Sequence, residues 1–403
     1  MKRRAFLGAA AAMLAGCDFS VADGLFNACA ARTPERLRTH ALVAAAWHGI
    51  DAQLVWDAHC HVFGNGDSGA GLWFNPGMER IWKPQQFVQR LFYLNAGCAH
   101  DAPGKVDASV VDRLLNQCEA MPAGFRALLF AFDWARDDAG RPAPERSTFH
   151  VSDDYAAGLA ARHPQHFEWA ASIHPYDPQA LDRLDSAVAR GARAVKWLPT
   201  AQNIDPASAR CDRFYARLAE LRLPLITHAG DERAVQAHGE DLGNPLKLRR
   251  PLGAGVRVIV AHCASLGVGR DLDRGGSAVA ANFEMFARLM DDPQYGPTLA
   301  GDLSAVTQGN RMDVVATLLE RRDWHSRLLN GSDYPLPGVL PLVWLPALVE
   351  RGLLAATAVE PLKELRDHNV LLFDFVLKRS LVNNGAGFAR SVFETRPYFL
   401  LTV

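Results

Sequence analysis

Two histidines, two residues apart, close one of the apolar segments of this chain. His59 and His61 stand in Asp57-Ala-His-Cys-His, directly after Leu54-Val-Trp. On a β-strand, side chains two residues apart project from the same face. Both imidazoles could therefore bind one metal ion, whereas Cys60 would point to the opposite face and is not counted as a ligand. Taken alone, this spacing is equally compatible with an incidental pair of histidines.

Three further apolar segments end in a residue of the same kind. Pro224-Leu-Ile-Thr leads to His228, Val258-Ile-Val-Ala leads to His262, and Leu328-Leu-Asn-Gly-Ser leads to Asp333. A buried polar group at the end of a strand costs free energy unless it is satisfied. Polar side chains at four such ends therefore favour one shared site over independently hydrogen-bonded core residues.

The elements that must position these side chains alternate along the chain. Short apolar or β-branched segments predict strands at Gln53–His59, Ala127–Phe132, Glu168–Ile173, Ala192–Leu198, Pro224–Thr227, Arg257–Ala261, Thr298–Leu303 and Arg327–Asn330. Amphipathic segments predict helices at Lys83–Asn95, Asp153–Arg162, Pro178–Arg190, Pro206–Leu221, Gly276–Met290, Met312–Arg322, Leu342–Arg351 and Pro361–Lys378. Ser152 or Asp153, and Asp205 before Pro206, are the expected N-caps.

This alternation predicts the fold class. Eight parallel βα units close an α/β (β/α)₈ TIM barrel, whose active site lies at the carboxyl ends of the strands. Residues 64–82 form a long loop after the first strand, and Trp73 and Phe74 within it could line a substrate pocket or pack on the barrel. The helices after the eighth strand could cover the barrel or form a homodimer interface.

The N-terminal residues are predicted to be an export signal. Arg3-Arg4, a short apolar run and Leu14-Ala-Gly-Cys17 resemble a twin-arginine signal that ends in a lipobox. A lipidated Cys17 would anchor the protein on the periplasmic side of the inner membrane, for which Asp18 is a retention signal in some bacteria; a plain signal peptide and a chance cysteine are the alternatives. The expected organisation is a signal at 1–17, a tether and helix at 18–50, the barrel at 51–380 and a tail at 381–403.

Composition narrows the partners. The formal net charge is −1 and no basic run occurs, so a nucleic-acid partner is excluded and a small-molecule substrate is expected. Six cysteines follow Cys17 without a regular spacing. An exported protein can form disulfides, and Cys98 with Cys118 is the first pair to test.

The ordered set His59-x-His61, His228, His262 and Asp333 resembles the amidohydrolase superfamily. The closer similarity is to the branch of aminocarboxymuconate semialdehyde decarboxylase and the "amidohydrolase 2" metal-dependent hydrolases, over residues 51–380. Three further phrases support it: Gly191-Ala-Arg-Ala-Val-Lys196-Trp-Leu-Pro199, Ser172-Ile-His174-Pro175 and Gly331-Ser-Asp333-Tyr-Pro335.

The resemblance implies roles for these residues. His59, His61 and His228 would be metal ligands, Asp333 a ligand or the base that takes a proton from water, and His262 a group that polarises the substrate or acts as acid or base. Imidazoles with one carboxylate suit zinc first, and also manganese, iron or cobalt. A bound divalent ion lowers the pKa of water and so provides a nucleophile at neutral pH.

Two residues keep alternative roles. In some branches of the superfamily the lysine at the position of Lys196 is carbamylated and bridges two metals; it could instead bind a substrate carboxylate or lie against Asp302. His174 could line the site or make a supporting hydrogen bond.

The reaction that we expect from the sequence is metal-dependent hydrolysis of an ester, lactone or amide. The alternative is non-oxidative decarboxylation of an aromatic or muconate-like acid, which uses the same kind of site. A non-catalytic binding lipoprotein would not need every ligand position to be filled. A structural zinc site would favour cysteine ligands, which this set lacks.

Overall fold

Eight parallel strands close a barrel in the part of the chain that the structure, a computed structural model, describes: residues 27–30, 32–99 and 104–400. One ladder runs β1-β3-β5 and a second runs β12-β11-β8-β7-β6. Bridges from Ala171 to Val195 and from Cys60 to Tyr334 join the two ladders at both seams. The predicted TIM barrel is confirmed. Its strands are β1 (Trp56–His61), β3 (Arg126–Phe130), β5 (Phe167–Ala170), β6 (Val195–Trp197), β7 (Leu225–His228), β8 (Val258–Ala261), β11 (Leu299–Asp302) and β12 (Leu328–Leu329).

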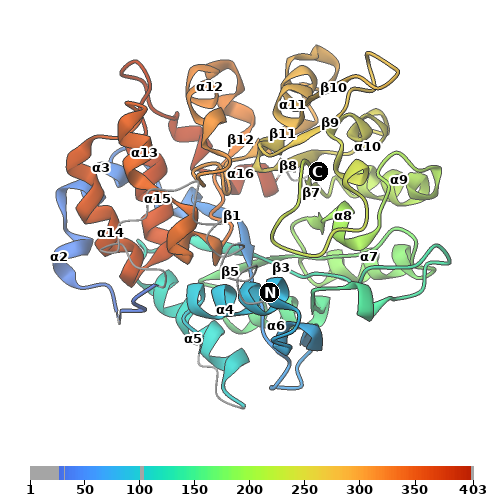
Figure 1. The fold of residues 1–403 in the computed structure, drawn as a ribbon, viewed down its shortest axis with the longest axis horizontal. Helices are drawn as coiled ribbons and strands as arrows, with labels where there is room; N and C mark the ends of the chain where they lie inside the picture. Colours follow the sequence, from blue (N-terminus) through green and yellow to red (C-terminus); the bar gives the residue numbers. More distant parts are fainter. Residues whose placement is uncertain (1–26, 31, 100–103, 401–403) are drawn as a thin grey trace, which may run out of the picture.

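Helices surround these strands, and α13, α14 and α15 lie together on one side (Figure 1). The side chain of Ser152 accepts a hydrogen bond from the Tyr155 amide, so the cap predicted for α6 is confirmed. The helices of the described residues are α2 (Glu35–Arg38), α3 (Ala41–Trp47), α4 (Pro84–Ala96), α5 (Val106–Glu119), α6 (Asp153–Arg162), α7 (Ala180–Ala189), α8 (Pro199–Gln202), α9 (Asp212–Glu220), α10 (Arg249–Gly253), α11 (Asn282–Asp291), α12 (Val315–Glu320), α13 (Leu345–Glu350), α14 (Val359–His368), α15 (Val370–Ser380) and α16 (Arg396–Phe399).

Three helix predictions were wrong at identifiable points. Asp205 does not cap α9: its carboxylate accepts the Ala207 amide in a local turn, and α9 begins seven residues later, at Asp212. The segment predicted as one helix at Pro361–Lys378 is two helices, because Asn369 has an extended backbone and caps α15 through the Leu372 amide. Helix α11 starts late because β10 (Val279–Ala281) pairs with β9 (Val268–Arg270).

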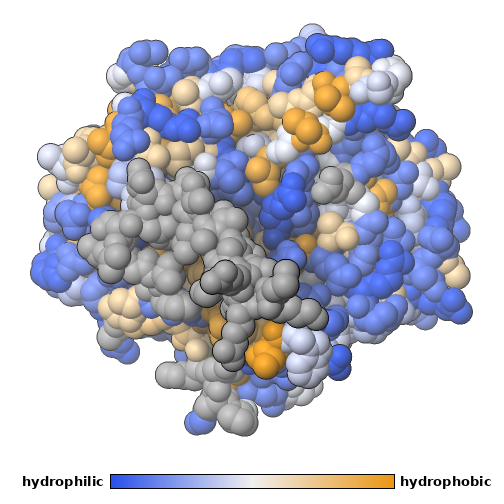
Figure 2. Space-filling model, viewed as in Figure 1, coloured by the Kyte–Doolittle hydropathy of each residue, from blue (hydrophilic) through white to orange (hydrophobic). Residues whose placement is uncertain are grey.

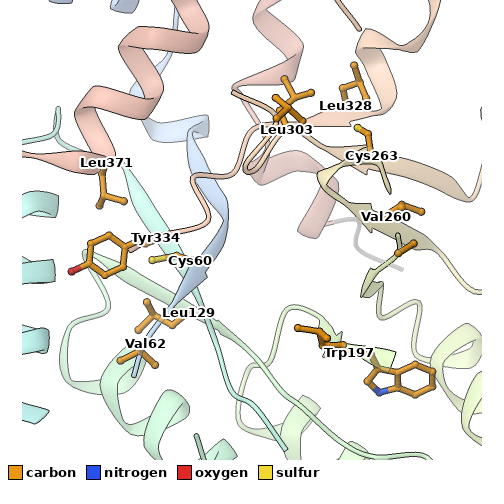
Figure 3. Close-up of a cluster of buried hydrophobic side chains, with 14 of the residues drawn as sticks. Cys60, Val62, Leu129, Trp197, Val260, Cys263, Leu303, Leu328, Tyr334 and Leu371 are labelled. Carbon is orange, nitrogen blue, oxygen red and sulfur yellow. The ribbon is translucent and has the colours of Figure 1, made fainter. Parts of the chain in front are cut away.

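The side chains of the strands divide between two apolar layers. Residues such as Trp56, Leu128 and Ile226 fill the barrel, and Phe399 of the segment expected to be a tail packs against them. The other faces of the strands contact the helices. Figure 3 shows Cys60 and Tyr334 facing Leu371 of α15 in this outer layer. Cys60 therefore points away from the barrel interior, as predicted.

The long loop after β1 carries structure of its own. Its β2 segment (Leu72–Phe74) pairs antiparallel with β4 (Phe149–Val151). The Trp73 ring packs edge-on against Trp134 with ring centroids 4.9 Å apart, while Phe74 is buried against Phe63. These aromatic side chains therefore pack against other rings.

Hydrophilic residues dominate the visible face of the molecule, with hydrophobic residues in small groups (Figure 2). No helix of the described residues has the length and apolar character needed to span a bilayer. The predicted signal at 1–17, including Cys17, lies outside the described residues, so its anchoring role stays a prediction.

One disulfide ties the N-terminal segment to α4. It joins Cys29 to Cys98, whereas Cys118 is a buried free thiol, so the pairing of Cys98 with Cys118 was wrong. The Asn27 amide also binds the side chain of Asn95, and this contact brings the N-terminal segment to the end of α4. Disulfides persist in oxidising compartments, which agrees with export.

We expect the double variant Cys29→Ser/Cys98→Ser to lose about 3 kcal/mol of unfolding free energy. The bond closes a loop between residues 69 positions apart, and its loss frees the unfolded chain. Denaturant unfolding of the oxidised protein, the reduced protein and the variant measures this effect. Reduced wild type should match the variant; equal stability before and after reduction would contradict the prediction.

Candidate metal centre

The carboxyl ends of four barrel strands bring the predicted side chains to one mouth of the barrel. His59 and His61 end β1, His228 ends β7, His262 follows β8 and Asp333 follows β12. His59 is fully buried, and His61 keeps a side-chain exposure of 17%. The site is therefore closed at its base and retains access beside His61.

Three of the predicted ligands converge on one point. The Nε2 atoms of His59 and His61 are 3.3 Å apart, and the Oδ1 atom of Asp333 lies 3.4 Å from the first and 3.3 Å from the second. Ligand atoms in a tetrahedral zinc site with bonds of ~2.0–2.1 Å are about 3.3–3.4 Å apart. These three atoms thus have the spacing of one face of such a tetrahedron, and the donor set fits a divalent ion.

The fourth predicted ligand is turned elsewhere. The ring of His228 lies beside that of His262, with centroids 5.2 Å apart. Its Nε2 atom is 3.2 Å from the Asp231 carbonyl oxygen, and its Nδ1 atom is 3.5 Å from a carboxylate oxygen of Glu232. In the described residues, His228 does not join a group of three close metal-ligating atoms.

The backbone turns sharply at two of these residues. His262 and Asp333 both have positive φ angles, 56° and 61°, and Cys263 and Ala264 continue the left-handed turn after His262. Such conformations cost about 1–3 kcal/mol each for residues other than glycine and cluster at functional sites. The His262 amide is held at 2.9 Å by the carboxylate of Asp302, which supports the first of these turns.

Electrostatics keep His59 neutral and Asp333 ionised. Burial, reinforced by the nearby Lys196 charge, lowers the pKa of His59 to about 4. Burial alone would raise the pKa of Asp333, but His262, His61 and His59 outweigh it and hold that pKa well below its usual range. Neutral imidazoles beside a carboxylate are the protonation states that metal binding needs.

Lys196 lies next to the converging ligands. Its side chain is buried, and its Nζ atom is 3.4 Å from Nε2 of His59 and 5.0 Å from the centre of the Phe130 ring. Burial lowers its pKa to about 8, although the carboxylates of Asp302 and Asp333 work against the shift. Lys196 is therefore placed to act at the metal centre.

His174 is engaged away from this centre. Its Nε2 atom lies 2.9 Å from the Gln202 carbonyl oxygen, and its Nδ1 atom accepts a hydrogen bond from the Tyr176 amide at 3.2 Å. Both ring nitrogens thus have partners in the protein. This arrangement fits a supporting hydrogen bond, the second of the two roles expected from the sequence.

Sequence reasoning missed several polar residues of the site. Asp302 was considered only as a partner of Lys196, yet its Oδ2 atom is 2.8 Å from Nδ1 of His59. Ser304, two residues further on, contacts both His59 and His262. The available signal was the pattern used for the other strands: β11 also ends in a polar residue. Glu232 beside His228 follows no such strand pattern.

Comparisons with known proteins agree with the fold. The chain matches the family described as amidohydrolase over residues 56–360, more than half of its length. No curated protein matches it.

Three solved structures share the fold at low similarity. A TIM-barrel protein from Bordetella bronchiseptica is 15% identical with a TM-score of 0.45, covering 79% of this chain and 99% of its own. A candidate 2-pyrone-4,6-dicarboxylic acid hydrolase from Pseudomonas putida is 16% identical with a TM-score of 0.44, covering 80% and 97%. The 5-carboxyvanillate decarboxylase of Sphingomonas paucimobilis is 9% identical with a TM-score of 0.37, covering 71% and 90%. We draw nothing about the reaction from similarities at this level.

Proposed function

The chain belongs to the amidohydrolase family, and from this premise we propose that it is a metal-dependent hydrolase of an ester, lactone or amide. The observation that carries the proposal is the triangle of Nε2 of His59, Nε2 of His61 and Oδ1 of Asp333, with edges of 3.3–3.4 Å. Zinc suits these ligands best, and manganese, iron or cobalt are alternatives. His228 is the proposed fourth ligand, for which its ring would turn away from Glu232.

A divalent ion held here would supply Lewis acidity, which polarises a substrate oxygen and lowers the pKa of water. The Asp333 carboxylate accepts the proton of the attacking water and returns it to the leaving group. Lys196 places a buried positive charge 3.4 Å from Nε2 of His59 and stabilises negative charge that develops on the substrate. His262, whose ring centroid is 4.9 Å from that of His59, contacts the substrate from the opposite side of the mouth.

Decarboxylation is the second candidate, and the position of Lys196 favours it. A buried ammonium beside the metal ligands can hold a substrate carboxylate next to the ion. Export favours hydrolysis, and the disulfide between Cys29 and Cys98 supports export. We place the protein on the periplasmic side of the inner membrane, lipid-anchored through Cys17.

Metal content and product analysis together test the proposal. Elemental mass spectrometry of the tag-free mature protein should find about one zinc or manganese per chain. The loaded protein is then supplied with panels of esters, lactones, amides and aromatic carboxylates. Metal-dependent hydrolysis is expected; release of CO₂ from a carboxylate would replace it with the decarboxylase. Two metals per chain would assign Lys196 a bridging role, and no metal after supplementation would overturn the proposal.

A further inference from the structure

Two buried residues lie behind the histidines of the metal centre. Asp302 and Ser304 are both fully buried at the end of β11. Asp302 Oδ2 is 2.8 Å from Nδ1 of His59, and Ser304 Oγ is 3.0 Å from the same nitrogen. The Nδ1 atom of His262 lies 2.7 Å from Ser304 Oγ and 3.0 Å from the Ser304 carbonyl oxygen. Both rings thus turn their Nδ1 atoms toward the same two residues.

The chemistry of these partners decides where the ring protons are. An ionised carboxylate and a backbone carbonyl accept hydrogen bonds and cannot donate them. The Nδ1 atom of His59 must therefore donate to Asp302, and that of His262 must donate to the Ser304 carbonyl. The opposite tautomer would set a nitrogen lone pair against an oxygen lone pair inside the protein, where an unmatched polar group is costly.

The remaining hydrogen bonds agree with this assignment. The Ser304 hydroxyl donates to Asp302 Oδ1, so its own lone pairs remain free to accept from the two Nδ1–H groups. Asp302 Oδ1 also accepts the amides of His262 and Ser304 at 2.9 and 3.0 Å. Every donor in this group has an acceptor, and every acceptor faces a donor.

We infer that Asp302 and Ser304 are a positioning pair that fixes His59 and His262 as the Nδ1–H tautomers and keeps both Nε2 lone pairs for the site. The pair acts through the histidines and does not itself contact substrate. As a consequence, neutral His262 accepts a proton or coordinates through Nε2 and does not donate one. This deepens the proposed function, since it specifies which nitrogen of each histidine serves the metal centre, but it needs no bound ion to be true.

Nitrogen NMR of histidine-labelled protein tests the inference directly. A protonated and a bare ring nitrogen have well-separated ¹⁵N shifts, and long-range ¹H–¹⁵N correlations distinguish Nδ1 from Nε2. Spectra are recorded on the full mature protein before and after chelation, at a pH where the rings are neutral. The variants His59→Gln and His262→Gln assign the signals by their loss. Protonated Nδ1 in both residues is expected; a protonated Nε2 in either would overturn the inference.

Variants of the pair provide the second measurement. In Asp302→Asn an amide can donate to Nδ1, so the His59 signals should shift toward the Nε2–H form and zinc affinity should fall about 10–100-fold. Asp271→Asn is the matched control, because Asp271 is equally buried but pairs with Arg288. Unchanged His59 signals in Asp302→Asn, or the same change in the control, would contradict the inference. Because the tautomers are read without metal or substrate, this test can succeed even if the proposed hydrolysis fails.

Discussion

Replacing His59 and His61 together by alanine is expected to abolish metal binding and to lower turnover by about three orders of magnitude or more. The substitution removes two of the three converging ligand atoms, and the remaining carboxylate of Asp333 cannot hold a divalent ion alone. The ion contributes several kcal/mol of charge stabilisation in the transition state, and each 1.36 kcal/mol corresponds to about tenfold in rate.

Elemental mass spectrometry and steady-state kinetics on the same preparations check this expectation. His48→Ala is the control, because His48 is exposed and lies at the end of α3, outside the barrel. It should retain both metal and activity. A double variant that folds, keeps its metal and remains active would show that these histidines do not form the metal centre.

The second large effect is expected at Lys378, a buried charge behind the site. Its Nζ atom donates to Asp374 Oδ2 and to the Gly331 carbonyl oxygen, both at 2.7 Å, and its side chain is fully buried. In Lys378→Met the carboxylate of Asp374 loses its partner inside the protein. Breaking a buried pair on one side costs about 3–5 kcal/mol, and we expect a loss of that size in the free energy of unfolding.

The same substitution should weaken metal binding. Gly331 lies close against β1, since a Cβ atom at this position would come within 2.8 Å of the His59 backbone nitrogen. Lys378 thus holds the segment that carries Asp333 against the strand that carries the two histidines. A shift of this segment would widen the ligand triangle.

Denaturant unfolding of a double-variant cycle measures the energy. Asp374→Leu/Lys378→Met removes both charges and should recover most of the loss, because an apolar pair carries no desolvation cost. Arg190→Met breaks the exposed pair with Asp154 and should cost at most about 1 kcal/mol. If Lys378→Met were as mild as Arg190→Met, the buried pair would not stabilise the fold.

Local patterns in the sequence were sufficient for the barrel strands and for part of the site. Each strand was visible as an apolar segment, and polar residues at the strand ends identified His59, His61 and Asp333, which the structure brings together. The period of two also placed Cys60 correctly on the outer face. These features depend on neighbours within a few residues, which a single sequence displays directly.

Contacts between distant segments were decided by the tertiary structure. The partner of Cys98 proved to be Cys29, 69 residues away, because the fold sets the N-terminal segment against the end of α4. Asp302 contacts His59 across 243 residues, where the closed barrel brings the end of β11 toward β1. His228 faces Glu232 because the loop after β7 folds back on its own strand. The sequence by itself determined which strands carry polar ends; ring orientation and proton position depend on closure of the barrel, which no local pattern encodes.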